Sequence, residues 1–253
     1  MPEQTRNEKP RGLTRDGLRG LGLLLCALGA LGSAVFQNGL LGLSRYTGAE
    51  LLAAMQASDT VMGYATAAIL LQAAGACALP IFTFLLVEGF SHTADLKRYA
   101  LRLGAAAALC EVPYNLASSG KWLDLSTRSP VLALLLALAM LYLFAHFSGA
   151  GARTLLVRCA AGAAALVWAL VLHIDNGAAV VVLAAVLWLL RAHAQWQVLA
   201  GCAASALAFP APFGMLAVHF YNGEKGKAPR LACYAAYPIM LLLFGLVGTY
   251  VLK

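Results

Sequence analysis

The chain has 253 residues, of which 61% are hydrophobic and 11% are charged. An ordinary soluble domain has about 25% charged residues, so this composition excludes that class and indicates an integral membrane protein. The net charge of +7 does not indicate a nucleic-acid-binding protein, because the basic residues lie at the ends of apolar runs and form no stripe with aromatic side chains.

The first 17 residues mix both charge signs with Pro and Gly and contain little that a fold could bury. This composition predicts a disordered cytoplasmic tail at 1–17. We expect residues 18–253 to form a single transmembrane domain.

Eight apolar runs follow the tail, and we expect each to cross the lipid bilayer as a helix. The runs cover about 18–43, 60–90, 99–117, 130–147, 154–172, 177–190, 196–219 and 231–252. They predict an all-α fold, a polytopic transmembrane helical bundle of about eight spans.

Proline removes a backbone donor and clashes with the preceding turn. Pro80 therefore predicts a broken second helix, and Pro210 and Pro212 allow the same in the seventh.

The Lys and Arg residues are distributed unevenly between alternate loops. With the N-terminus inside, 12 of the 18 fall on the inner side. Because cytoplasmic loops carry an excess of Lys and Arg, we expect a multi-pass protein of the cell membrane with both termini in the cytoplasm. The basic segment 224–230 would then lie outside and opposes this orientation.

Charged residues near apolar runs are candidates for function, because they are costly to place in a membrane. Glu88 and His92 are four residues apart, so they share a helix face and could form a carboxylate-supported base. Contact of both side chains with interfacial water is an equally good interpretation.

Two further pairs have the same spacing in the third run. Arg98 and Arg102 could hold a phosphate group through bidentate hydrogen bonds, or extend to lipid phosphates. Glu111 and Asn115 lie near the other end of that run, on a different face unless Pro113 distorts the helix.

Polar residues also end the fifth and seventh runs. Asp175 with His173 could form a second base, although a helix-ending turn explains Asp175 equally well. Tyr221 and Asn222 precede the last run. No spacing indicates a metal site.

Five segments resemble the TraX family of membrane proteins. They are ALPIFTFLLVEGFSHTADLKRYALRL at 78–103, CEVPYNLA at 110–117, DNG at 175–177, FYNGEKG at 220–226 and YPIMLLL at 237–243. The family is named for a conjugation-linked protein that acetylates pilin, and it is similar to the multi-span membrane acyltransferases. The resemblance implies transfer of an acetyl group from acetyl-CoA to an amine or hydroxyl acceptor.

The resemblance also implies a set of site residues. We expect His92 and Glu88 to be catalytic, and the donor or acceptor to contact Arg98, Tyr99, Arg102, Glu111, Asn115, Asp175, Tyr221 and Asn222.

The chain departs from the family pattern at two histidines. Gly29 and Ala30 replace an Asp-His pair in the first helix, and Met240 replaces a His near the C-terminus. Two alternatives therefore stay open, a non-catalytic member of the family and a small-molecule transporter. The acceptor and the oligomeric state do not follow from the sequence.

Overall fold

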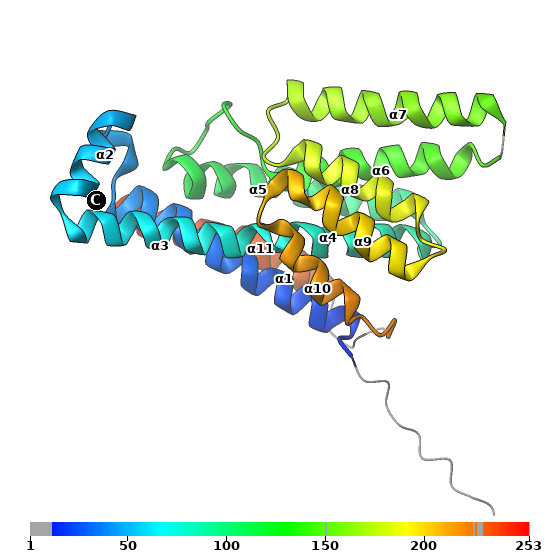
Figure 1. The fold of residues 1–253 in the computed structure, drawn as a ribbon, viewed down its shortest axis with the longest axis horizontal. Helices are drawn as coiled ribbons and strands as arrows, with labels where there is room; N and C mark the ends of the chain where they lie inside the picture. The colour runs from blue at the N-terminus through cyan, green and yellow to red at the C-terminus, as the bar shows by residue number, and fades with distance from the viewer. Residues whose placement is uncertain (1–11, 150, 225, 227–229, 253) are drawn as a thin grey trace, which may run out of the picture.

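The computed structural model describes residues 12–149, 151–224, 226 and 230–252, with only the backbone of 230–233. This part of the chain is helical, and its β-type pairings are two isolated bridges. The α-helices are α1 (Arg15–Ala30), α2 (Gly48–Ala57), α3 (Asp59–Ala76), α4 (Ala78–Ser91), α5 (Leu96–Ser119), α6 (Pro130–His146), α7 (Ala152–Val171), α8 (Gly177–Leu189), α9 (Ala194–Ser205), α10 (Gly214–His219) and α11 (Arg230–Leu246). Two π-helical segments, η1 (Leu31–Leu40) and η5 (Val247–Val251), extend α1 and α11 (Figure 1).

The all-helical prediction is confirmed, but eight spans are not. Among the described residues, four helices are long and apolar enough to cross a membrane, namely Arg15–Leu40, Asp59–Ser91, Ala152–Val171 and Tyr234–Val251. Helices α6 and α8 are apolar but have only 17 and 13 residues. Helix α5 has 24 residues but carries Lys97, Arg98 and Arg102 in its first turns.

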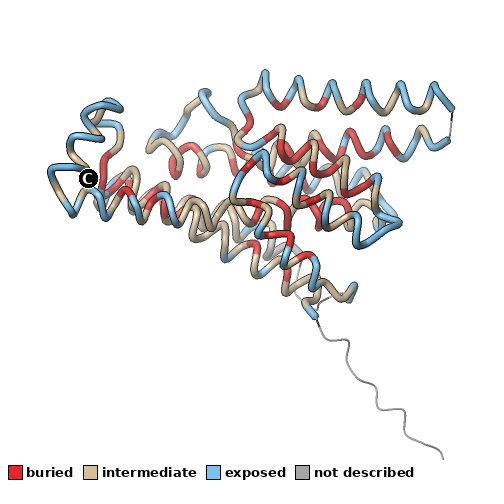
Figure 2. Tube along the Cα trace, viewed as in Figure 1, coloured by how far each residue is buried: buried red, intermediate tan, exposed pale blue. Residues whose placement is uncertain are grey.

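The core lies between α4, α6 and α8, where buried residues concentrate (Figure 2). Ala133, Ala137 and Ala184 are fully buried there, and such small side chains let helices approach closely in a membrane protein. Helix α8 is enclosed by α4, α6, α7 and α9. Because these helices cover it, α8 can be shorter than the thickness of a bilayer.

The bundle has two ends, which we name by their residues. The basic end contains the start of α1 at Arg15, the end of α4 at Ser91 and the start of α11 at Arg230. The distal end contains Leu40, Ser119 and Val251, and Figure 1 marks the C-terminus at this end. Trp122 donates a hydrogen bond to the hydroxyl of Tyr250 over 2.8 Å at this end.

The last apolar run before α11 is a hairpin that returns to the end where it began. Helix α9 begins beside the end of α8, because Gln197 donates to the carbonyl of Leu187. The chain reverses at 206–213 at the depth of Cys77, whose thiol donates to the carbonyl of Pro210. Helix α10 then packs along α4 back to the basic end (Figure 1). The break expected at Pro210 and Pro212 is present at this reversal. The segment 196–219 does not cross the bundle from one end to the other.

This reversal changes the position of the C-terminus. Helices α1 and α11 start at the same end and run in the same direction, so Arg15 and Val251 lie at opposite ends of the bundle. The prediction that both termini lie on one side of the membrane is not confirmed. It counted the run at 196–219 as a crossing.

The second run breaks as predicted. Pro80 has no backbone N–H for the carbonyl of Ala76, and the helix is interrupted at Cys77 between α3 and α4. The predicted tail at 1–17 overlaps the described residues only from Gly12 onward. Residues 1–11 lie outside the described part of the chain, whereas the backbone of Leu13 pairs with the segment at Tyr221, and Thr14 caps α1.

Candidate functional site

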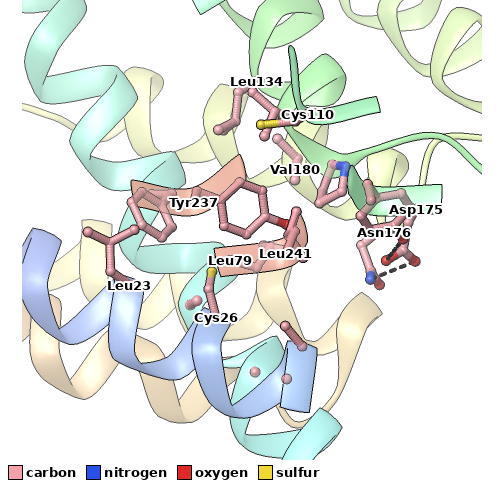
Figure 3. Close-up of a pocket in the computed structure, with 18 of the residues that line it drawn as sticks. Leu23, Cys26, Leu79, Cys110, Leu134, Asp175, Asn176, Val180, Tyr237 and Leu241 are labelled. Atoms are coloured by element: carbon pink, nitrogen blue, oxygen red, sulfur yellow. Dashed lines mark hydrogen bonds between the residues drawn. The ribbon is translucent and has the colours of Figure 1, made fainter. Parts of the chain in front are cut away.

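An elongated cavity of about 540 Å³ lies between α1, α3, α4, α5, α6, α8 and α11 (Figure 3). Its wall is mostly apolar, with Leu79, Leu134 and Val180 among the lining residues. The volume is within the range of about 300–1,000 Å³ that is typical of small-molecule sites. A largely apolar wall with few polar groups is suited to a ligand that has an apolar, chain-like part.

Asp175 and Tyr114 form the best-defined polar pair on the cavity wall. The hydroxyl of Tyr114 donates to Oδ2 of Asp175 over 2.8 Å. Figure 3 shows the second bond of this carboxylate, in which Nδ2 of Asn176 donates to Oδ1 over 3.0 Å. Among the described lining residues, Asp175 is the one carboxylate, and none is a histidine. Asp175 is therefore the group in the cavity best suited to accept a proton.

Local backbone structure holds Asp175 in this position. Arg128 and Ile174 form an isolated parallel bridge, in which the N–H of Asp175 donates to the carbonyl of Arg128 over 3.0 Å. Asn176 follows with a φ of 52°, a left-handed conformation that Asn tolerates better than most residues. This turn starts α8 and fixes the carboxylate at the cavity wall.

The two ends of the cavity differ in chemistry. Towards the basic end it is lined by Arg19, Tyr99 and Tyr234. Towards the distal end it is lined by Gln37 and Gln72, whose side chains are joined by a hydrogen bond of 2.6 Å. The cavity thus extends between a cationic group at one end and neutral amides at the other.

Glu88 and His92 lie at the basic end, outside the cavity lining. The spacing argument is correct, because Nδ1 of His92 lies 3.5 Å from Oε1 of Glu88. The same carboxylate accepts from Arg15 over 3.3 Å and from the hydroxyl of Tyr221 over 3.4 Å. The His92 side chain is 53% exposed. This group of residues, which we call the Glu88 cluster, joins α1 to α4 and to the segment after α10.

Tyr221 is predominantly a hydrogen-bond donor in this cluster. Partial burial raises the pKa of its phenol above the ordinary value, so the hydroxyl keeps its proton at neutral pH. Asn222 lies beside the cluster, where its N–H donates to the carbonyl of Leu13.

Arg98 and Arg102 are both exposed on the first turns of α5. Arg98 pairs with Asp95 over 3.0 Å, and its side chain is 84% exposed. The Nε of Arg102 donates to the carbonyl of Arg98. Neither arginine lines the cavity, but Arg102 is within electrostatic range of Tyr99, which does.

Glu111 and Asn115 lie on α5 beside the cavity lining. Oε2 of Glu111 accepts from the N–H of Ser129 over 3.5 Å, and Asn115 is buried. They face away from the exposed Arg98 and Arg102, as the helix rotation predicts.

The predicted site residues therefore fall into separate groups. Tyr99 and Asp175 line the cavity, whereas Glu88, His92 and Tyr221 form the cluster at the basic end. Sequence reasoning missed Arg15 and Tyr114. Tyr114 could have been found, because it lies between Glu111 and Asn115 in a segment that resembles the TraX family. Arg15 was not identified because it falls within the tail predicted at 1–17.

In the described part of the chain, no group of three His, Cys, Asp or Glu side chains could hold a metal ion. These observations define a class of protein, a helical membrane protein with a partly open, elongated cavity between its helices and a carboxylate in the cavity wall. The sequence profile of the TraX protein family matches residues 52–248, and the chain belongs to this family. Neither the curated proteins nor the solved structures gave a match.

Proposed function

We propose that this member of the TraX family is a membrane acyltransferase that moves an acetyl group from acetyl-CoA to an amine or hydroxyl acceptor. The observation that carries the proposal is the Asp175–Tyr114 pair in the wall of an elongated, mainly apolar cavity. Such a cavity can hold the acyl-bearing arm of the donor among apolar side chains, which limits the access of water that would hydrolyse the thioester.

The donor enters from the basic end. Arg19 lines the cavity there, and Arg102 lies near Tyr99 on the adjacent surface. Guanidinium groups bind phosphates through charge-assisted hydrogen bonds, so these two residues suit the phosphates of coenzyme A. Arg98 contributes charge from the same turn of α5.

Asp175 accepts the proton that the acceptor must lose. The acceptor nitrogen or oxygen forms a bond to the acetyl carbonyl carbon, the carbon–sulfur bond breaks, and coenzyme A leaves as the thiol once its sulfur takes up a proton. Tyr114 donates to Asp175 in the resting state and orients the carboxylate. The assignment of His92 and Glu88 as catalytic stays a prediction from the sequence, which their position outside the cavity lining does not support.

For the membrane topology we propose seven crossings and one hairpin that enters and returns. The crossings are α1 with η1, α3 with α4, α5, α6, α7, α8, and α11 with η5. Most described Lys and Arg side chains lie at the basic end, namely Arg15, Arg19, Lys97, Arg98, Arg102, Arg153, Arg158 and Arg191. The distal end has Arg45, Lys121 and Arg128. The basic end is therefore cytoplasmic and the C-terminus lies on the other side.

This topology places the basic segment 224–230 on the inside. The backbone N–H of Arg15 donates to the carbonyl of Glu224 over 3.0 Å, so Glu224 lies beside the start of α1. The positive charge of the segment 224–230 opposed the orientation expected from the sequence. It agrees with the orientation proposed here, which places this segment on the cytoplasmic side.

The test is acetyl transfer by the purified full-length protein in detergent, with radiolabelled acetyl-CoA and a panel of amine and hydroxyl acceptors. The expected result is label on an acceptor and release of free coenzyme A. Asp175→Asn should lower the rate by about 10²–10⁴-fold, the range for loss of a general base. Asp124→Asn, the same change on the loop 120–129, should have no effect. No transfer to any acceptor, or equal rates for both variants, would contradict the proposal.

A second candidate is a non-catalytic member of the family that binds a ligand in the same cavity. The observation that favours it is that Gly29 and Ala30, which replace the expected Asp-His pair, line the cavity. Binding of acetyl-CoA without turnover would support this candidate.

A further inference from the structure

Two oxygen atoms on one face of α5 are buried without a hydrogen-bond donor. They are Oε1 of Glu111 and Oδ1 of Asn115. Asn115 as a whole is 4% exposed. Residues four apart on a helix lie one above the other, so these two side chains are neighbours. Both atoms are acceptors if Glu111 is ionised, and a buried acceptor that lacks a donor destabilises the folded protein.

No described cation neutralises Glu111. The ion pairs within 4.0 Å in the described chain involve Glu88, Asp16 and Asp95, but not Glu111. Arg128 is within electrostatic range from the loop before α6, yet it makes no such pair. The other titratable groups nearby are Cys110 and Tyr114 on α5, with Asp175 and Tyr237 beyond Tyr114. None of these four is a cation.

We infer that Glu111 is a proton-binding site, a neutral carboxylic acid whose O–H donates to Oδ1 of Asn115. A single proton supplies the donor that both orphan oxygens lack. It also removes the charge of a carboxylate that is partly buried and has no ion-pair partner within 4.0 Å among the described residues, and burial favours the neutral form of such a group. Oε2 continues to accept from the N–H of Ser129.

The site lies next to the cavity but does not depend on acyl transfer. Glu111 is three residues before Tyr114, which donates to Asp175, and Ser129 precedes the cavity-lining Pro130. The protein therefore holds a proton directly behind the Asp175–Tyr114 pair. This inference rests on burial and hydrogen bonding alone, so failure of the proposed acyltransferase activity would leave it standing.

The test is labelling with dicyclohexylcarbodiimide. This apolar reagent adds to a protonated carboxylic acid across its carbon–nitrogen double bond, and the adduct rearranges to a stable N-acylurea. The full-length protein in detergent is treated at pH 7, and modified peptides are identified by mass spectrometry. Label is expected on Glu111, and Glu111→Gln should abolish it. Glu50, an exposed carboxylate that accepts from the N–H of Thr47, should remain unlabelled.

A second measurement covers the case in which the reagent does not reach the site. An acid that is protonated in the folded protein and ionised in the unfolded chain takes up a proton on folding, so stability falls as the pH rises. Glu111→Gln removes this dependence and keeps a donor for Asn115. The difference in melting temperature between Glu111→Gln and the parent should therefore become more positive from pH 6 to pH 9. The difference between Glu50→Gln and the parent should not depend on pH in this way.

One result would overturn the inference, namely absence of label on Glu111 together with a Glu111→Gln difference in melting temperature that does not vary with pH.

Discussion

Arg15 lies where three parts of the chain meet at the basic end. Its guanidinium donates to Glu88 on α4, and its backbone N–H donates to Glu224. Both side chains of the pair are mostly buried, with exposures of 14% and 22%. Such a pair contributes more than a surface ion pair, because water screens it less and removal of one partner leaves the other charge partly buried.

We predict that Arg15→Ala lowers the free energy of unfolding by about 1.5–3 kcal/mol, the range for hydrogen bonds to charged groups. The measurement is thermal unfolding in detergent. Arg98→Ala is the matched control, because the Arg98 side chain is exposed and a substitution there should change stability by about 0.5 kcal/mol or less. Equal melting temperatures for the two variants would show that Arg15 does not join these segments.

Arg102 tests where the donor binds. We predict that Arg102→Ala weakens binding of acetyl-CoA by about 1.5–3 kcal/mol, with a larger loss at low salt, because exposed charges are screened by ions. Binding is measured by isothermal titration in detergent. Arg45→Ala makes the same change at the distal end and should leave affinity unchanged. A stronger effect of Arg45→Ala would show that the donor binds at the distal end, which contradicts our proposal.

His92 distinguishes the prediction from sequence from the assignment based on the cavity. Because His92 is half exposed and lies outside the cavity lining, we predict that His92→Ala retains most of the acetyl transfer activity. The rate is compared with that of His146→Ala, a histidine at the end of α6. If His92→Ala instead lost about 10²–10⁴-fold, His92 would be the base that its sequence context suggests.

At the scale of helices, α1 and α3 pack through a contact between two glycines. A Cβ atom built on Gly75 would lie 2.6 Å from the Cα of Gly29, closer than real contacts allow. The helices can approach this closely only because both residues lack a side chain. The contact also forms part of the cavity wall.

We predict that Gly75→Ala destabilises the protein by about 1–3 kcal/mol, since the methyl group must push α1 and α3 apart. Gly63→Ala is the control on the same helix, where nothing lies within 4 Å of the added atom. It should stabilise by up to about 1 kcal/mol, because alanine favours a helix over glycine. Chemical or thermal unfolding of both variants gives the comparison, and a neutral Gly75→Ala would show that this contact can relax.

The sequence predicted the helices better than their paths. Apolar runs locate helices because burial and lipid both favour them, and the break near Pro80 follows from a missing backbone donor. A run such as 196–219 has the composition of a span, yet its path depends on what it packs against. The thiol of Cys77 and the close approach of Gly214 to α4 determine that path, and neither contact has a local signal.

The same distinction applies to the candidate site. The spacing of Glu88 and His92 was sufficient to predict their contact, because one helix contains both. The partnership of Tyr114 and Asp175 joins two elements 61 residues apart, and periodicity along a single helix carries no information about it.

At the scale of the whole molecule, the parallel course of α1 and α11 predicts termini on opposite sides of the membrane. Reporter fusions after residue 120 and after residue 253 should report the same outer side, and a fusion at the N-terminus should report the inside. A periplasmic-active phosphatase and a cytoplasm-active fluorescent protein provide complementary reporters. Termini on one side would restore the topology expected from the sequence and exclude the returning hairpin.

The hairpin of α9 and α10 has a consequence for how the chain enters the membrane. Its turn packs Ala208 and Ala211 against Leu79 and Ala179, which belong to helices made earlier. With only 12 residues, α9 is too short to remain in lipid alone, where its terminal backbone groups would lack partners. Insertion must therefore follow an order in which α4 and α8 are already in place before this segment docks. Because the hairpin begins and ends on the same side, a failure of docking would leave the orientation of α11 unchanged.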